Sequence, residues 1–221
     1  MADELIRPID ENTAKAIEES ARALGKGFDL VGGLGAYLAR ALGGVPENLI
    51  GLLVGDWLIH KRVRRWSEMQ DETRRILDQR NVKEPYDISP SIALPLIEAA
   101  LDEDREGLKE LWAKLLAAAM DPKRKHLVRA DLISTLKQLE PLDVIVLNAV
   151  YDASGTQFAP NARDNLAQRF SVTSDEMTVC FQNLERLECF IRRGDQPPER
   201  LMVRENPSLG PRGRLLMQAV S

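Results

Sequence analysis

At 221 residues, the chain is long enough for one large or two small hydrophobic cores. Hydrophobic residues make up 44% and charged residues 29%, which is typical of a globular protein, and the formal net charge of −4 excludes a chain that is basic throughout. Uninterrupted apolar runs fall short of the roughly 18 residues of a membrane-spanning helix. The amino terminus lacks the basic and then apolar layout of a secretory signal, so we expect a cytoplasmic protein.

The residue content also argues against catalysis and metal binding. Cys180 and Cys189, with His60 and His126, form neither a disulfide framework nor a zinc-binding motif. No HExxH, GxSxG or P-loop pattern occurs. The carboxylates fall on polar helix faces and in turns, where we expect them to be solvated. The sequence therefore predicts no catalytic residue, no metal ligand and no cofactor. The alternative to a protein without catalytic activity is a hydrolase.

The amino-terminal part changes character near Gly25. Residues 12–42 are expected to be helical, but the sequence from Phe28 onward is rich in glycine. A glycine inside a helix costs about 1 kcal/mol relative to alanine, so these glycines are expected to serve close helix approach or mobility. Gly51 and Gly55 have the spacing that lets two helix backbones approach closely. The predicted packing residues of this hairpin are Gly32, Gly35, Gly51 and Gly55.

The longest periodic run extends from Pro46 to about Arg80 and contains the densest basic cluster of the chain. The residues of this cluster with candidate roles in contacting a membrane or an anion are Lys61, Arg62, Arg64 and Arg65. A solvated helix face is one interpretation, because Glu68, Asp71 and Glu72 lie one turn away. The other two are attraction to anionic lipid headgroups and binding of a phosphate-bearing ligand, for which no phosphate loop is present.

The glycine-rich segment Phe28–Ile59 has two interpretations of its own. It is either a hairpin packed in the core or a hairpin that leaves the core and enters a bilayer. Charged residues interrupt it, which argues against a stable spanning segment in the resting protein. These residues are Asp29, Arg40, Glu47 and Asp56.

A helical hairpin is predicted for residues 92–122. Its first helix follows Ser89-Pro90, a capping residue and a proline at the first helical position. Its second helix ends at Asp121-Pro122 and has one apolar face at helical spacing, formed by Leu108, Leu111, Trp112, Leu115, Leu116 and Ala119. Acidic residues fill the turn and the start of the second helix, where a helix dipole favours negative charge. We expect this hairpin to bury Trp112.

The carboxy-terminal part has the element order of a winged-helix domain. Helices are expected at 142–151, 162–170, 174–187 and 211–220, with two short strands at 189–192 and 201–204. The third helix of such a domain would enter the DNA major groove, but here it is acidic, which removes the electrostatic attraction to phosphates. Wing arginines are the candidate contacts with a nucleic-acid backbone, namely Arg192, Arg193, Arg200 and Arg204. Contact with a protein, or simple packing, is favoured over DNA.

Several segments of the chain occur together in one known family. These are ALPLIEAA, LKELWAKLLAAAMDP and LKQLEPLD, with LIGLLVGDWLIHKRVRRW upstream and GPRGRLLMQAV at the end. In this order they resemble the bacterial abortive-infection alpha family, which is associated by name with defence against phage. The resemblance implies that role and no mechanism, and it supplies no catalytic residues.

Together these features predict a mainly α protein with a helical amino-terminal region and a winged-helix-like module that carries a small two-stranded wing. The predicted divisions are 1–84, 85–140 and 141–221. The predicted function is non-enzymatic phage defence through the glycine-rich hairpin, in the cytoplasm or peripherally at the inner membrane. The predicted partners are a protein or phage component and an anionic membrane surface, with a homo-oligomer as a further alternative and nucleic acid not expected. A regulatory winged-helix protein that contacts nucleic acid or another defence component is the rival function.

Overall fold

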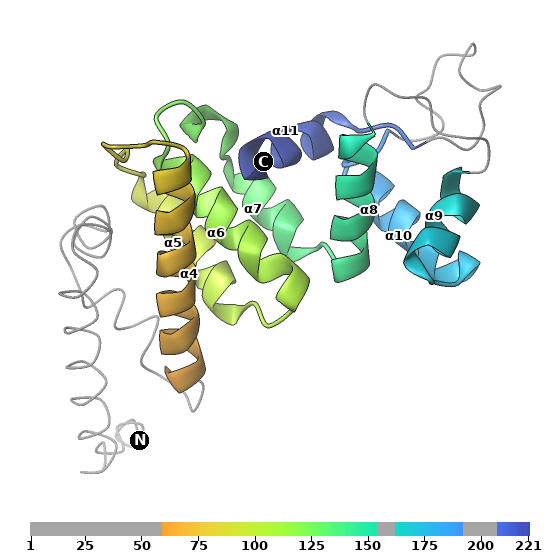
Figure 1. The fold of residues 1–221 in the computed structure, drawn as a ribbon, viewed down its shortest axis with the longest axis horizontal. Helices are drawn as coiled ribbons and strands as arrows, with labels where there is room; N and C mark the ends of the chain where they lie inside the picture. Colours follow the sequence, from red (N-terminus) through yellow and green to blue (C-terminus); the bar gives the residue numbers. More distant parts are fainter. Residues whose placement is uncertain (1–58, 154–161, 192–206) are drawn as a thin grey trace, which may run out of the picture.

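The structure is a computed structural model, and it describes residues 59–153, 162–191 and 207–221. Within these ranges the chain forms eight α-helices and one short 3-10 helix, and no strand (Figure 1). The predicted mainly α fold is therefore confirmed. The glycine-rich segment, with Gly32, Gly35, Gly51 and Gly55, lies outside the described residues.

The helix α6, Glu106–Met120, is the centre of the described fold. It packs on α4 (Ile59–Gln79) and on α5 (Pro90–Asp102), the first helix of the predicted hairpin. Ser89 occupies the capping position before α5 as predicted, but its hydroxyl lies 2.8 Å from that of Ser91 and makes no capping hydrogen bond. Ten side chains of α6 are buried, which makes it the core of the molecule.

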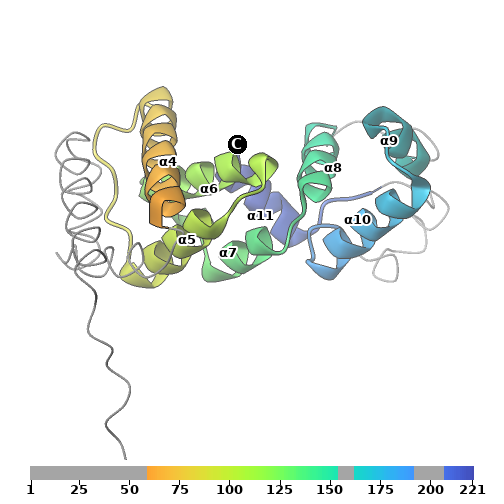
Figure 2. The ribbon, with the colours of Figure 1, turned by 90° about the horizontal axis from the view of Figure 1, so that it is seen from below.

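The remaining helices extend the molecule in one direction from this core (Figures 1 and 2). After α6 come the 3-10 helix η1 and five α-helices, whose bounds are η1 Lys125–Leu127, α7 Ala130–Lys137, α8 Pro141–Asp152, α9 Ala162–Phe170, α10 Ser174–Arg186 and α11 Pro211–Val220. At the end of the molecule distant from α4, α10 packs on both α8 and α9. The last helix, α11, returns to contact α6, η1 and α8.

The predicted two-stranded wing is not seen in the described residues. The first expected strand begins there, but its one ladder contact is an antiparallel bridge from Phe190 to Leu209. The second expected strand, at 201–204, lies outside the described residues, as do Arg192, Arg193, Arg200 and Arg204. The helix order α8, α9, α10 agrees with the sequence prediction, and Thr173 caps α10 by accepting a hydrogen bond from the Glu176 N–H at 3.2 Å.

Candidate functional site

The basic cluster lies at the start of α4, and two of its residues connect this helix to the end of α5. Arg62 donates to the Asp102 carboxylate at 2.7 and 3.0 Å, and Arg65 donates to the Leu101 carbonyl at 2.8 Å. Cationic side chains are favourable beside the last carbonyls of a helix, so both contacts stabilise the junction. Lys61 and Arg64 lie exposed on the surface.

Of the two exposed residues, Arg64 is held only weakly by the protein. The Arg64 side chain is 78% exposed, and its ion pair with Glu68, at 2.9 Å, is a surface pair one helical turn apart. Such pairs contribute about 0–1 kcal/mol, because water screens them. Arg64 can therefore exchange Glu68 for an external anion at low cost, whereas Arg62 and Arg65 cannot leave α5 without breaking a helix junction.

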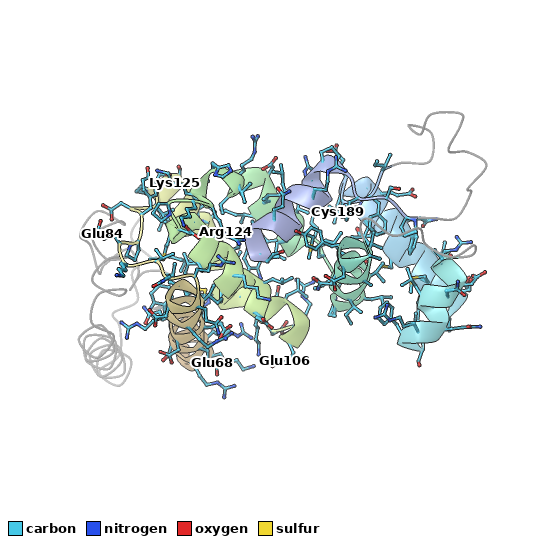
Figure 3. The ribbon with its side chains drawn as sticks, turned by 45° about the horizontal axis from the view of Figure 1, so that its top comes forward. Glu68, Glu84, Glu106, Arg124, Lys125 and Cys189 are labelled. Carbon is cyan, nitrogen blue, oxygen red and sulfur yellow. The ribbon has the colours of Figure 1, made fainter. Side chains whose placement is uncertain are left out.

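A cleft of about 440 Å³ runs between α4 and α6 beside this cluster. Glu68, in the middle of α4, and Glu106, at the start of α6, both line this cleft and lie near each other in Figure 3. Its basic side chains bind groups of the protein itself: Arg75 pairs with Glu72, Lys109 with Glu106, and Arg65 with the carbonyl described above. Because the lining charges are balanced within the protein, the cleft gives no indication of a specific ligand.

The turn between α5 and α6 contains a buried charged network that the sequence did not reveal. Arg105 binds both oxygens of Glu103, with its Nε 2.7 Å from Oε1 and its Nη2 2.8 Å from Oε2, while the Trp112 ring N–H donates to Oε2 at 3.2 Å. Arg105 also donates to the Leu139 carbonyl at 2.7 Å and pairs with Glu140 at 3.3 Å. The network thus ties the central hairpin to the start of α8.

This network corrects the expectation that the carboxylates are solvated. The Glu103 side chain is only 4% exposed, and Asp121 and Asp143 are also buried. Their oxygens accept hydrogen bonds from nearby backbone or side-chain donors, which is the condition for burying a carboxylate at acceptable cost. The satisfied hydrogen bonds indicate a structural role for these groups.

We predict that the Glu103 network makes stability depend on pH. Burial raises the pKa of the Glu103 carboxyl, but hydrogen bonds from Arg105 and Trp112 outweigh it and hold this pKa below its ordinary value. A lowered pKa in the folded state stabilises the protein above the unfolded pKa of about 4.3, and this contribution is lost as pH falls through the folded pKa. The stability gap between the parent and Glu103→Gln should therefore be largest at neutral pH and shrink in acid.

Urea unfolding at a series of pH values from neutral to acid checks this prediction. Glu98→Gln is a matched control, because Glu98 is exposed on α5. A gap between the parent and Glu103→Gln that stays constant over the whole pH range would contradict the prediction.

A second hollow, the α8–α10 groove, has a volume of about 780 Å³. Its lining residues come from α8, α10 and the turn before α8, namely Gln138, Glu140, Leu142, Asp143, Asp175, Glu176, Val179, Cys180, Gln182, Asn183 and Arg186. Asp143 lies at its base and accepts hydrogen bonds from the Glu140 N–H at 2.8 Å and the Asn183 amide at 2.6 Å. Val179 is 64% exposed, although it is a large apolar residue.

The two cysteines lie buried in the same region, and both are free thiols. Burial raises the pKa of the Cys180 thiol, and the neighbouring Asp143 carboxylate raises it further. Burial also raises the pKa of Cys189, to about 12. Both thiols are therefore protonated at neutral pH, which is the unreactive form. In the ranges that the structure describes, no group of three or more His, Cys, Asp or Glu side chains is placed to hold a metal ion.

Two further findings concern whether a described helix could span a membrane and which family the chain belongs to. In the described part of the chain, no helix combines the length and apolar character needed to cross a bilayer.

A search of curated proteins finds no match to this chain. No solved structure matches either. A family model named abortive infection alpha matches residues 61–205, which is well over half of the chain and includes the three central segments of the resemblance, ALPLIEAA, LKELWAKLLAAAMDP and LKQLEPLD. The chain therefore belongs to the abortive infection alpha family.

Proposed function

We propose that this protein acts in defence against phage, without catalysing a reaction, and that the glycine-rich segment Phe28–Ile59 becomes membrane-active when the protein is triggered. Membership of the abortive infection alpha family supports the defence role. The observation that carries the membrane mechanism is the position of Lys61 and Arg64, which are exposed on α4 directly after this segment. In its resting state the protein is cytoplasmic or peripheral at the inner membrane.

The physical basis of the mechanism is electrostatic attraction followed by apolar insertion. Each Lys or Arg near an anionic bilayer surface contributes about 1 kcal/mol to binding, and salt screens this attraction. A segment rich in glycine loses more conformational freedom on folding than other segments do. We therefore expect that little free energy is needed to release it from the resting protein. Lys61 and Arg64 would hold the protein at the surface while the segment inserts.

Flotation of the full chain with anionic liposomes tests the electrostatic step. The double variant Lys61→Gln/Arg64→Gln should weaken partitioning about 30-fold, because two contributions of about 1 kcal/mol are lost. Arg62 and Arg65 are left in place, since they join α4 to α5. The matched control, Lys83→Gln/Lys123→Gln, removes the same charge from two other exposed positions and should partition like the parent.

Two results would contradict this mechanism. One is equal partitioning of the two double variants, which would mean that only overall charge matters. The other is equal binding of the parent to neutral and anionic liposomes at low salt, which would remove the role of the basic residues.

A regulatory binding protein is the second candidate function, and the α8–α10 groove favours it. In this alternative, the winged-helix-like module contacts another defence component, or a second copy of the chain, and the amino-terminal part responds. Asp175 and Glu176 lie exposed at the start of α10, where a DNA-reading helix would need neutral or basic residues. A protein contact is therefore preferred over nucleic acid.

A further inference from the structure

The α8–α10 groove combines exposed apolar surface with a firm base. Val179 is 64% exposed at the centre of α10, and Ile145 on the neighbouring α8 is 47% exposed. Leu142, one turn before Ile145, lines the groove and is half-buried. Single exposed apolar residues are common, but Val179 and Leu142 line one groove together, which is typical of an interaction surface.

Hydrogen bonds from α10 to α8 and to the turn before α8 hold the base of the groove in place. The Asn183 amide donates to Asp143 at 2.6 Å and to the Gln138 carbonyl at 3.1 Å. Arg186 donates to Gln138 Oε1 at 2.9 Å and to Asn183 Oδ1 at 2.7 Å. Binding to a groove that is already formed costs less free energy, because fewer side chains must be ordered on association.

The rim of the groove is acidic at the start of α10, where Asp175 and Glu176 lie exposed, and these two residues are called the acidic rim. At the other end of α10, Glu140 already pairs with Arg105. Among the lining residues Arg186 is the one with a positive charge. Hydrogen bonds from the Thr173 backbone and hydroxyl also lower the pKa of Glu176, so its carboxylate is ionised at neutral pH. The acidic rim therefore repels anions and attracts cations.

We propose that the α8–α10 groove binds a short amphipathic helix of a partner protein, whose apolar stripe packs on Val179 and Leu142 and whose flanking Lys or Arg side chains pair with the acidic rim. The groove runs along most of α10, about 16 Å, which corresponds to roughly three turns of a bound helix. Helix-in-groove binding with two or three apolar anchors is a common mode of peptide recognition. The acidic rim disfavours nucleic acid and anionic lipid as occupants.

This inference goes beyond the membrane mechanism and does not depend on it. The groove and the basic residues of α4 lie at opposite ends of the described molecule (Figure 1). Loss of peptide binding and loss of liposome binding can therefore be measured separately. If the membrane mechanism fails its test, the groove proposal is unaffected, and the reverse also holds.

The test uses a fluorescently labelled model peptide of about 14 residues, with leucines at i, i+3, i+4 and i+7 and lysines at the flanking positions. Fluorescence anisotropy with the full chain should show saturable binding that weakens with salt. Val179→Ser should raise Kd about tenfold through lost apolar burial. Asp175→Lys should also raise Kd, and it should flatten the salt dependence.

Matched controls separate specific binding from general charge attraction. Asp78→Lys changes the charge equally on an exposed face of α4 and should leave Kd unchanged. A peptide with glutamate in place of lysine should not bind. Circular dichroism of each variant confirms that the helices are intact, because Val179 and Asp175 are both exposed.

Several outcomes would overturn the proposal. These are no saturable binding of the lysine peptide, equal effects of Asp175→Lys and Asp78→Lys, or no effect of Val179→Ser. Binding of a random DNA duplex that Val179→Ser weakens would assign the groove to nucleic acid instead. Light scattering that shows a parent dimer and a Val179→Ser monomer would assign the groove to a second copy of this chain.

Discussion

Replacing Trp112 with alanine is expected to lower the free energy of unfolding by about 3–5 kcal/mol, the usual cost of truncating a large core aromatic. Trp112 is 1% exposed in the middle of α6, which confirms the prediction that the central hairpin buries it. The same substitution removes the ring N–H that donates to the buried Glu103 carboxylate. A buried carboxylate that loses a donor adds to the cost.

Urea unfolding monitored by circular dichroism measures this effect. Trp112→Phe is the informative control, because it removes the hydrogen bond to Glu103 but keeps most of the apolar volume that alanine would lose. Its cost should be clearly smaller than that of alanine. Equal costs for the two variants would mean that packing around Trp112 contributes little, and the account of the core would be wrong.

The second large effect is expected at Gly213, where α11 meets the segment after α10. A Cβ atom at this position would overlap the carbonyl oxygen of Cys189, and a Cβ at Gly210 would overlap that of Glu188. Backbone atoms cannot move aside as a flexible side chain would. We expect Gly213→Ala to cost about 3 kcal/mol, the upper end of the usual cost of overpacking.

Gly107 in α6 supplies the matched control for this prediction. A Cβ there would lie 3.7 Å from the Cβ of Pro141, an ordinary contact, and the position is exposed. Gly107→Ala should therefore be neutral or stabilising by up to about 1 kcal/mol through helix propensity. Thermal unfolding of both variants measures this difference in stability. Similar midpoints would show that α11 does not approach the 188–190 backbone closely.

Helix positions were the part of the fold that could be predicted from the sequence. Proline and capping residues mark helix starts, so α8 begins at Pro141, α11 at Pro211, and α10 after the Thr173 cap, at or within one residue of the expected positions. The apolar periodicity of α6 identified its buried face. These features are local, and local chemistry determines them.

Contacts between distant segments could not be predicted in this way. Nothing near Glu103 in the sequence reveals that Arg105 and Trp112 surround it in a buried network that reaches Leu139. In the same way, the basic run at the start of α4 looks uniform, but Arg62 and Arg65 face the end of α5 while Lys61 and Arg64 face solvent. The packing of α5 against α4 determines this division, and a single helix pattern does not contain it.

The predicted wing is a second case in which contacts between distant segments could not be predicted from local sequence. Two short strands were predicted at 189–192 and 201–204, but the bridge found in the described residues joins Phe190 to Leu209, where the start of α11 is drawn close by Gly210. Tertiary packing of α11 therefore fixes the backbone around Phe190, and β-propensity alone does not determine the pairing. The winged-helix-like module remains a prediction beyond its helix order.

The central claim, phage defence through the glycine-rich segment, is tested most directly by the plating efficiency of a phage panel. The bacterial cells would express the parent, the Gly51→Leu/Gly55→Leu variant, the Gly107→Ala control or no protein. We predict that the parent and Gly107→Ala reduce plaque numbers, and that Gly51→Leu/Gly55→Leu, expressed at the same level, loses this protection because leucine blocks close helix approach. Equal plating with and without the parent across the panel would contradict the defence role. Full protection by Gly51→Leu/Gly55→Leu would contradict the role of the segment.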